Sequence, residues 1–141
     1  MRFWSFILLL SLLAPVHAED VKWVNSSTVK VDINCDGVPD VAKIGYVDEH
    51  VRLAVTLGAS NKTQVLEFGL GDSMAQDSLC GTDAALAIED TDYDLTEALG
   101  ENPEGFQRSK TCKGLNVSAG ECDSMHIYWN RVKKNIDWWR L

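Results

Sequence analysis

The sequence predicts a mainly β protein: a small antiparallel β domain with one short helix and disulfide bonds. Three observations lead to this expectation. The 141 residues are enough for one domain. Short runs rich in β-branched and aromatic residues recur between polar turns. Four cysteines follow a segment typical of an export signal, which favours a disulfide-bonded fold.

Residues 1–18 have the pattern of a signal peptide. Arg2 supplies a positive charge, an apolar segment runs over residues 6–16, and Val-His-Ala at 16–18 fits a signal peptidase site. The apolar segment is shorter than the roughly 20 residues that span a bilayer. We therefore expect cleavage after Ala18, no membrane insertion afterwards, and a single exported domain, residues 19–141, that is secreted or periplasmic.

The first half of this domain contains mostly strand signals. Strands are predicted over residues 21–24, 28–32, 41–47, 50–57 and 64–68, and the third and fourth form a hairpin. Residues 73–80 predict two helical turns with Asp72 or Ser73 as the N-cap. Residues 84–89 are apolar enough for a buried strand. Residues 90–110 predict a long acidic loop with at most one helical turn, at 95–99.

The C-terminus predicts a β-hairpin. Aromatic and β-branched residues alternate over residues 124–130, a polar turn covers 131–135, and the chain returns over 136–141. Because side chains alternate along a strand, Trp138 and Trp139 face opposite sides of the sheet. Large aromatic residues mostly serve burial, so one of the pair is expected in the core together with Trp129. The other is a candidate for partner binding.

The four cysteines, Cys35, Cys80, Cys112 and Cys122, predict two disulfides. Zinc is the alternative, but the chain has no CxxC pair. Cys112 with Cys122 and Cys35 with Cys80 is the favoured pairing, because residues 112–122 contain glycine and predict a hairpin or Ω-like loop. The sequence alone does not prove this connectivity.

Residues 32–40 carry the most specific chemical signal. Asp32, Asn34 and Asp36 place oxygen donors at alternate positions, Gly37 permits a sharp turn, and a further carboxylate follows. A hard cation such as calcium needs six or seven oxygen ligands gathered in this way. Lys43 stands where an EF-hand requires glutamate, and strands flank the segment, so an EF-hand is excluded. We expect one structural calcium ion bound by Asp32, Asn34, Asp36, the Val38 carbonyl and Asp40; the alternative is an Asp/Asn-rich turn without metal.

The segment DINCDGVPDVAKIGY, residues 32–46, resembles the calcium loop of FG-GAP and related VCBS-type repeats. In that family a DxNxDGxxD turn joins two antiparallel strands of a β-propeller blade, and the resemblance implies that the aspartates and the asparagine coordinate calcium. The residue between Asn34 and Asp36 is commonly glycine there, and it is Cys35 here. The motif occurs once, so a propeller of several blades is excluded.

Charge restricts the function of the protein. The chain has 21 acidic and 13 basic residues and a net charge of −8, which becomes −9 once Arg2 is removed with the signal peptide. Such a protein repels a phosphate backbone, so nucleic-acid binding is excluded. We expect a calcium-stabilised binding domain for an extracellular protein or glycan, for example an inhibitor of a basic secreted enzyme.

No catalytic constellation is recognisable. On a strand Ser124 and His126 share one face while Asp123 points to the other, so these residues do not form a triad. His126 is therefore treated as a hairpin residue. The alternative function is a small secreted hydrolase that uses the carboxylates of Asp90–Asp94. Clustering of those acids with His126 in one cleft would favour the hydrolase, and their dispersal would favour the binding domain.

Overall fold

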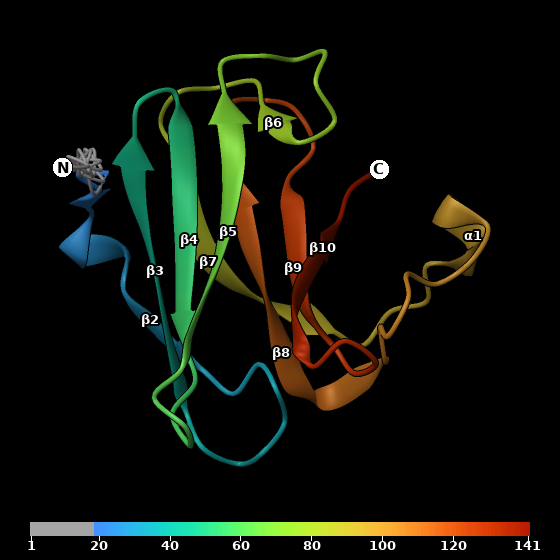
Figure 1. The fold of residues 1–141 in the computed structure, drawn as a ribbon. Coiled ribbons are helices and arrows are strands. Elements are labelled where there is room, and N and C mark those ends of the chain that lie inside the picture. Colours follow the sequence, from blue (N-terminus) through green and yellow to red (C-terminus); the bar gives the residue numbers. More distant parts are fainter. Residues whose placement is uncertain (1–18) are drawn as a thin grey trace, which may run out of the picture.

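The computed structural model describes residues 19–141 and shows two β-sheets packed face to face (Figure 1). The predicted signal peptide lies outside the described residues. The first sheet contains β1 (Lys22–Trp23), β2 (Val29–Val31), β3 (Asp40–Val47), β4 (His50–Thr56), β5 (Thr63–Leu70) and β6 (Ser78–Leu79). The second contains β7 (Ala85–Thr91), β8 (Ser109–Ser118), β9 (Met125–Asn130) and β10 (Asn135–Trp139). A 3-10 turn (Asn25–Ser27) and the helix α1 (Thr96–Leu99) complete the elements, and within residues 19–141 no helix is long and apolar enough to cross a membrane.

Strand order in both sheets is simple. The first sheet runs β1-β3-β4-β5-β6, with β2 also paired to β3, and the second runs β10-β9-β8-β7. Every pairing is antiparallel except that of β5 with β6. The predicted hairpin of β3 and β4 is confirmed, as is the mainly β fold class.

The core lies between the two sheets because the long strands direct apolar side chains to the inner face of each sheet. The first sheet contributes buried residues from its three long strands, and the second contributes the inward positions of β8, β9 and β10. The largest of them are Ile44, Leu53, Phe68, Leu115, Met125 and Ile127. One continuous apolar core therefore holds the two sheets together.

Two predictions for the middle of the chain need correction. Residues 73–80 do not form a helix: the Asp72 side chain accepts the Met74 N–H in a local turn at 2.8 Å, and Ser78 and Leu79 form β6 beside β5. Asp72 favours a turn rather than the start of a helix, because its carboxylate accepts a nearby backbone N–H in a local, non-helical conformation. The strand at 84–89 exists as β7, but it is an edge strand rather than a buried one, and Ile88 is 45% exposed.

The C-terminal hairpin is confirmed. Trp138 lies opposite Ile127, on the core side of the second sheet, and Trp139 lies opposite His126, on the outer side. The ring of Trp138 meets Phe68 edge-to-face, with ring centroids 5.6 Å apart. One tryptophan thus faces each side of the sheet, as the period of two requires.

All four cysteines are in disulfides, but the expected pairing is wrong. The bonds join Cys35 to Cys112 and Cys80 to Cys122, with Cα atoms 5.5 and 5.8 Å apart. The reason is that residues 112–122 are not a closed loop: most of them belong to β8. The six steps of extended strand from Cys112 to Ser118 cover about 20 Å, so Cys112 and Cys122 lie near opposite ends of the sandwich.

Candidate functional site

The loop of residues 32–40 joins β2 to β3 at one end of the sandwich (Figure 1). Two of its residues have left-handed backbone angles: Cys35 at a φ of 61° and Gly37 at 83°. Glycine adopts this conformation freely, whereas other L-residues rarely do. The structure therefore explains why glycine would suit position 35, and shows that Cys35 occupies it while bonded to Cys112.

The polar side chains of the loop bond to its own backbone. Asp32 accepts the N–H groups of Asp36 and Gly37 at 3.1 and 2.9 Å, and Asp36 accepts the Val38 N–H at 2.8 Å. Asn34 accepts the Asp36 N–H at 3.2 Å and donates its amide to the Asp36 carboxylate at 3.0 Å. These bonds turn three of the predicted ligand side chains toward one another.

Asp40 fastens the loop to the body of the protein. Its side chain is fully buried at the start of β3, and its two oxygens accept the N–H groups of Ile33, at 3.0 Å, and Gly58, at 2.9 Å. Gly58 has no room for a side chain, because a Cβ there would lie 2.2 Å from the Pro39 carbonyl oxygen. The turn after β4 therefore packs directly against the loop, and Asp40 joins the two.

The donor set of the loop suits a hard cation. Three carboxylates and an amide offer only oxygen, and a carboxylate oxygen that accepts one N–H keeps a lone pair for a metal. Across residues 19–141, however, no three His, Cys, Asp or Glu side chains are grouped to hold an ion. Calcium binding would thus require Asp32 and Asp36 to turn toward the fixed Asp40. The calcium site, with the Val38 carbonyl as its fifth ligand, stays a prediction.

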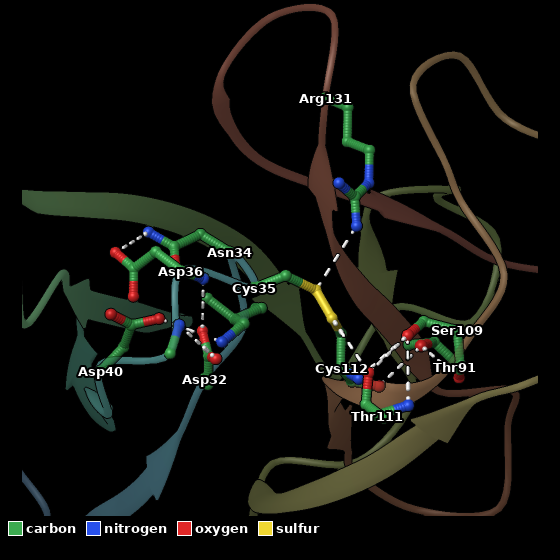
Figure 2. Close-up of a disulfide and its surroundings, with 12 residues drawn as sticks. Asp32, Asn34, Cys35, Asp36, Asp40, Thr91, Ser109, Thr111, Cys112 and Arg131 are labelled. Atoms are coloured by element: carbon green, nitrogen blue, oxygen red, sulfur yellow. Dashed lines mark hydrogen bonds between the residues drawn. A yellow bond between two sulfur atoms is a disulfide. The ribbon is translucent and has the colours of Figure 1, made fainter.

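The Cys35–Cys112 disulfide joins this loop to the second sheet. Figure 2 shows the acidic side chains on one side of Cys35 and the disulfide extending from the other side to β8. The Arg131 guanidinium, from the turn between β9 and β10, donates to the Cys35 sulfur at 3.4 Å. The loop is therefore held by a covalent bond on one side and by Asp40 on the other.

A second feature is the loop of residues 92–108, called the acidic loop below. It rests on an aromatic base formed by Tyr93, Phe106, Tyr128 and Trp139. Tyr93 and Phe106 stack with centroids 5.4 Å apart, and the other rings meet edge-to-face at 5.5 and 5.8 Å. The backbone also takes part: the Tyr128 hydroxyl donates to the Glu104 carbonyl at 2.9 Å. The two ends of the acidic loop are thus fixed on the outer face of the second sheet.

The phenols of the aromatic base stay neutral at physiological pH. Burial raises the pKa of Tyr93 to about 12, and the negative charge of Glu89 acts in the same direction. Burial likewise raises the pKa of Tyr128, with Asp137 and Glu104 adding to the effect. Ionisation of either ring would place a charge within the aromatic base, so the folded arrangement favours the protonated phenols.

The tip of the acidic loop has its own local structure. Leu95 is buried, and its N–H donates to the Asn102 side chain at 3.1 Å. Asp94 accepts both the N–H and the hydroxyl of Thr96, and these bonds lower the pKa of Asp94. Gly100, at a φ of 80°, ends α1 in the left-handed conformation. Figure 1 shows α1 standing away from both sheets.

The acids predicted for a hydrolase are dispersed. Asp90 pairs with Lys113, Asp92 pairs with Arg108 at 2.6 Å, and Asp94 bonds within the loop tip. They therefore do not converge on His126.

His126 instead contacts Glu89. Its Nδ1 lies 2.9 Å from the Glu89 carboxylate, and the Asn116 amide donates to the same carboxylate at 3.3 Å. Sequence reasoning missed this pair, because β7 and β9 are separated by β8 and only the strand order brings them together. The ring of His126 also stacks on Trp139, with centroids 4.0 Å apart and planes 9° apart.

The two candidate partner-binding residues, Trp138 and Trp139, are therefore both half-buried. Trp138 packs on the core, whereas Trp139 stacks on His126 and meets Tyr93 edge-to-face. Comparison of the chain with protein-family models, curated proteins and solved structures found no significant match. The resemblance of residues 32–46 to a calcium loop therefore remains local.

Proposed function

We propose that this protein is an exported, calcium-stabilised binding domain that presents its acidic loop to a basic extracellular protein. The observation that carries the proposal is the position of this loop. Its ends are fixed on the aromatic base and its tip stands away from the sheets (Figure 1). A preorganised loop loses less conformational entropy on binding than a flexible one.

The charge of the loop specifies the partner. Residues 92–108 contain five acids and a single basic residue, Arg108, which is paired with Asp92. Glu97, Glu101 and Glu104 are exposed, and the ion pairs formed among residues 19–141 do not involve them. Three free carboxylates on a projecting loop attract lysine and arginine side chains and steer a cationic protein toward this face.

The other functions considered have less support. A glycan-binding platform needs an aromatic ring with an open face, but His126 covers Trp139 at 4.0 Å. A hydrolase using Asp90, Asp92 and Asp94 needs those acids to converge, but each has a different partner. A basic protein is therefore the partner that the exposed chemistry favours.

Calcium would stabilise the end of the sandwich that carries the acidic loop. The loop of residues 32–40 connects to β8 through Cys35 and Cys112, and Arg131, which contacts Cys35, donates its backbone N–H to the Gly105 carbonyl at 3.0 Å. Ordering the 32–40 loop by a metal would thus support the base of the acidic loop. The metal has a structural purpose in this proposal.

The test is binding of the mature protein to immobilised poly-lysine and to a panel of basic secreted enzymes. The triple variant Glu97→Gln/Glu101→Gln/Glu104→Gln should weaken binding at least tenfold, and parent binding should weaken with added salt. The control triple Asp48→Asn/Glu121→Gln/Asp123→Asn removes the same charge from exposed sites elsewhere. Equal weakening by both triples would show that net charge alone acts, and would refute a specific binding loop.

A further inference from the structure

We propose that two copies of this chain associate through β7, an edge strand of the second sheet, in an antiparallel two-fold arrangement. The inference goes beyond the binding function proposed above, because the contact uses neither the acidic loop nor a metal. It depends on a difference between the sheet edges. Three edges are short or bonded to side chains, whereas β7 presents seven residues without such protection.

The N–H and C=O groups along the outer side of an edge strand can pair with another chain, and proteins commonly block them. β1 and β2, which share one edge, have only two and three residues, and β2 exposes Lys30. β6 has two residues, and the Arg140 guanidinium donates to the Ser78 carbonyl at 2.6 Å. On β10, the Ile136 N–H donates to the Gln64 side chain at 2.7 Å. Each of these edges is therefore a poor template for a further strand.

β7 differs from these strands in length, composition and bonding. Its sequence, ALAIEDT, contains neither lysine nor proline, the residues that commonly guard an edge. Within residues 19–141, β7 pairs with β8 alone and no side chain bonds to its backbone; the Tyr46 hydroxyl bonds to Ala84, before the strand begins. Three of its apolar residues are exposed: Ala85, Ala87 and Ile88, the last of them at 45%.

The side chains of β7 specify the register of the pairing. A two-fold axis at Ala87 places Leu86 opposite Ile88 of the second copy, and the same pair recurs on the other side of the axis. Leu86 and Ile88 both lie opposite buried residues of β8, on the inner face of the second sheet. Apolar side chains therefore face each other across the new strand pair, which comprises residues 85–89 of each copy.

The acidic residues of β7 are compatible with this register. Glu89 lies opposite Ala85 of the second copy, and in its own chain it contacts His126 at 2.9 Å. Asp90 is paired with Lys113 and lies outside the paired segment, as does the β-bulge that follows it. No two like charges stand directly opposite each other, an arrangement that would be destabilising.

The pairing joins the second sheets of the two copies into one continuous sheet and carries two acidic loops. β7 leads directly into the acidic loop, which begins at residue 92. Because the paired strands run in opposite directions, the two loops leave at opposite ends, roughly 30 Å apart along the strands. The dimer is therefore bivalent toward a basic partner, and bivalence raises the apparent affinity when both loops bind.

The first measurement is sedimentation velocity of the mature protein from micromolar to near-millimolar concentration. The parent should shift from the mass of a monomer to that of a dimer. Ile88→Lys should weaken this association at least tenfold, because an edge lysine must be desolvated on pairing. Val65→Lys is the matched control: it adds the same charge at an exposed apolar strand residue of the first sheet, and association should stay within twofold. A parent that stays monomeric, or equal weakening by both variants, would overturn the proposal.

The second measurement tests the register by oxidative cross-linking. In Ala87→Cys the two new thiols lie directly across the axis, where opposed Cα atoms are about 4.5–5.5 Å apart and a disulfide forms without strain. Ala85→Cys is the control, since its two copies are separated by about 13 Å along the strands. A covalent dimer should form at least tenfold faster in Ala87→Cys, as read on a non-reducing gel. Equal rates in the two variants would refute the pairing.

The third measurement uses only the parent and does not depend on whether a variant folds. Amide hydrogen exchange in residues 85–89 should slow at high protein concentration, whereas exchange in β10, the other edge of the sheet, should stay the same. Dimers by sedimentation without protection of β7 would place the interface elsewhere and refute the proposal. None of these measurements involves a basic protein, so failure here leaves the proposed function of the acidic loop untouched.

Discussion

Substitution of Asp40 distinguishes a structural role from a metal-binding role within the 32–40 loop. Its buried carboxylate accepts the N–H groups of Ile33 and Gly58, and Asp40→Ala leaves both without a partner. The Ile33 N–H is buried, and a buried polar group that loses its partner costs about 1–3 kcal/mol, whereas Gly58 is exposed and its N–H can bond to water instead. Asp40→Ala should therefore lower the free energy of unfolding by about 1–3 kcal/mol. This loss should occur even in chelator, because it does not involve a metal.

The assay is urea unfolding at pH 7 in chelator, followed by tryptophan fluorescence. Asp36→Ala is the matched control, since Asp36 lies in the same loop but is exposed, and its loss should cost less than about 1 kcal/mol without calcium. If Asp40→Ala unfolds at the same urea concentration as Asp36→Ala, Asp40 does not fasten the loop and the reasoning is refuted.

Two further predictions concern the aromatic residues. Trp138→Ala should lower the free energy of unfolding by about 3 kcal/mol because the ring packs on the core. Trp139→Ala should lower it by only about 1–2 kcal/mol, because this variant loses mainly contacts with neighbouring rings. Equal losses in urea unfolding would contradict the assignment of the two rings to opposite faces. The raised pKa of Tyr93 means that folding favours the neutral phenol. The stability that the neutral phenol contributes is complete below the ordinary tyrosine pKa of about 10. It is lost as the pH rises through about 12. Tyr93→Phe should therefore lose less stability than the parent across this range, and a Tyr93 absorbance change centred near pH 10 would refute the burial argument.

Local patterns in the sequence were sufficient for most strands. The hairpin of β3 and β4 and the C-terminal hairpin follow from alternation over consecutive residues, and alternation also places Trp138 and Trp139 on opposite faces. The side chains of Asp32, Asn34 and Asp36 lie close together because one short turn contains them, whereas Asp40 is held apart by its bonds to Ile33 and Gly58. Calcium binding by these side chains stays a prediction.

The features that the sequence did not predict depend on contacts between distant segments. β8 was not predicted because Gly114 and a polar composition resemble a loop, and only pairing with β7 and β9 makes residues 109–118 a strand. The disulfide pairing failed with it, since the length of β8 separates Cys112 from Cys122. The Glu89–His126 contact bridges strands that are not sequential neighbours, so no spacing in the chain indicates it.

Calcium-dependent stability is the most direct test of the account. Thermal unfolding of the mature parent should be measured in chelator and then in millimolar calcium, with magnesium as the competing cation and Asp36→Ala as the control. If calcium binds the folded loop and not the unfolded chain, as we propose, a hundredfold excess over Kd adds about 2.7 kcal/mol of stability. We therefore expect calcium to raise the parent melting temperature by several degrees. Magnesium should act weakly, and Asp36→Ala should respond little. A parent melting temperature that is indifferent to calcium, together with no heat of binding, would contradict the account and leave residues 32–40 as an acidic turn.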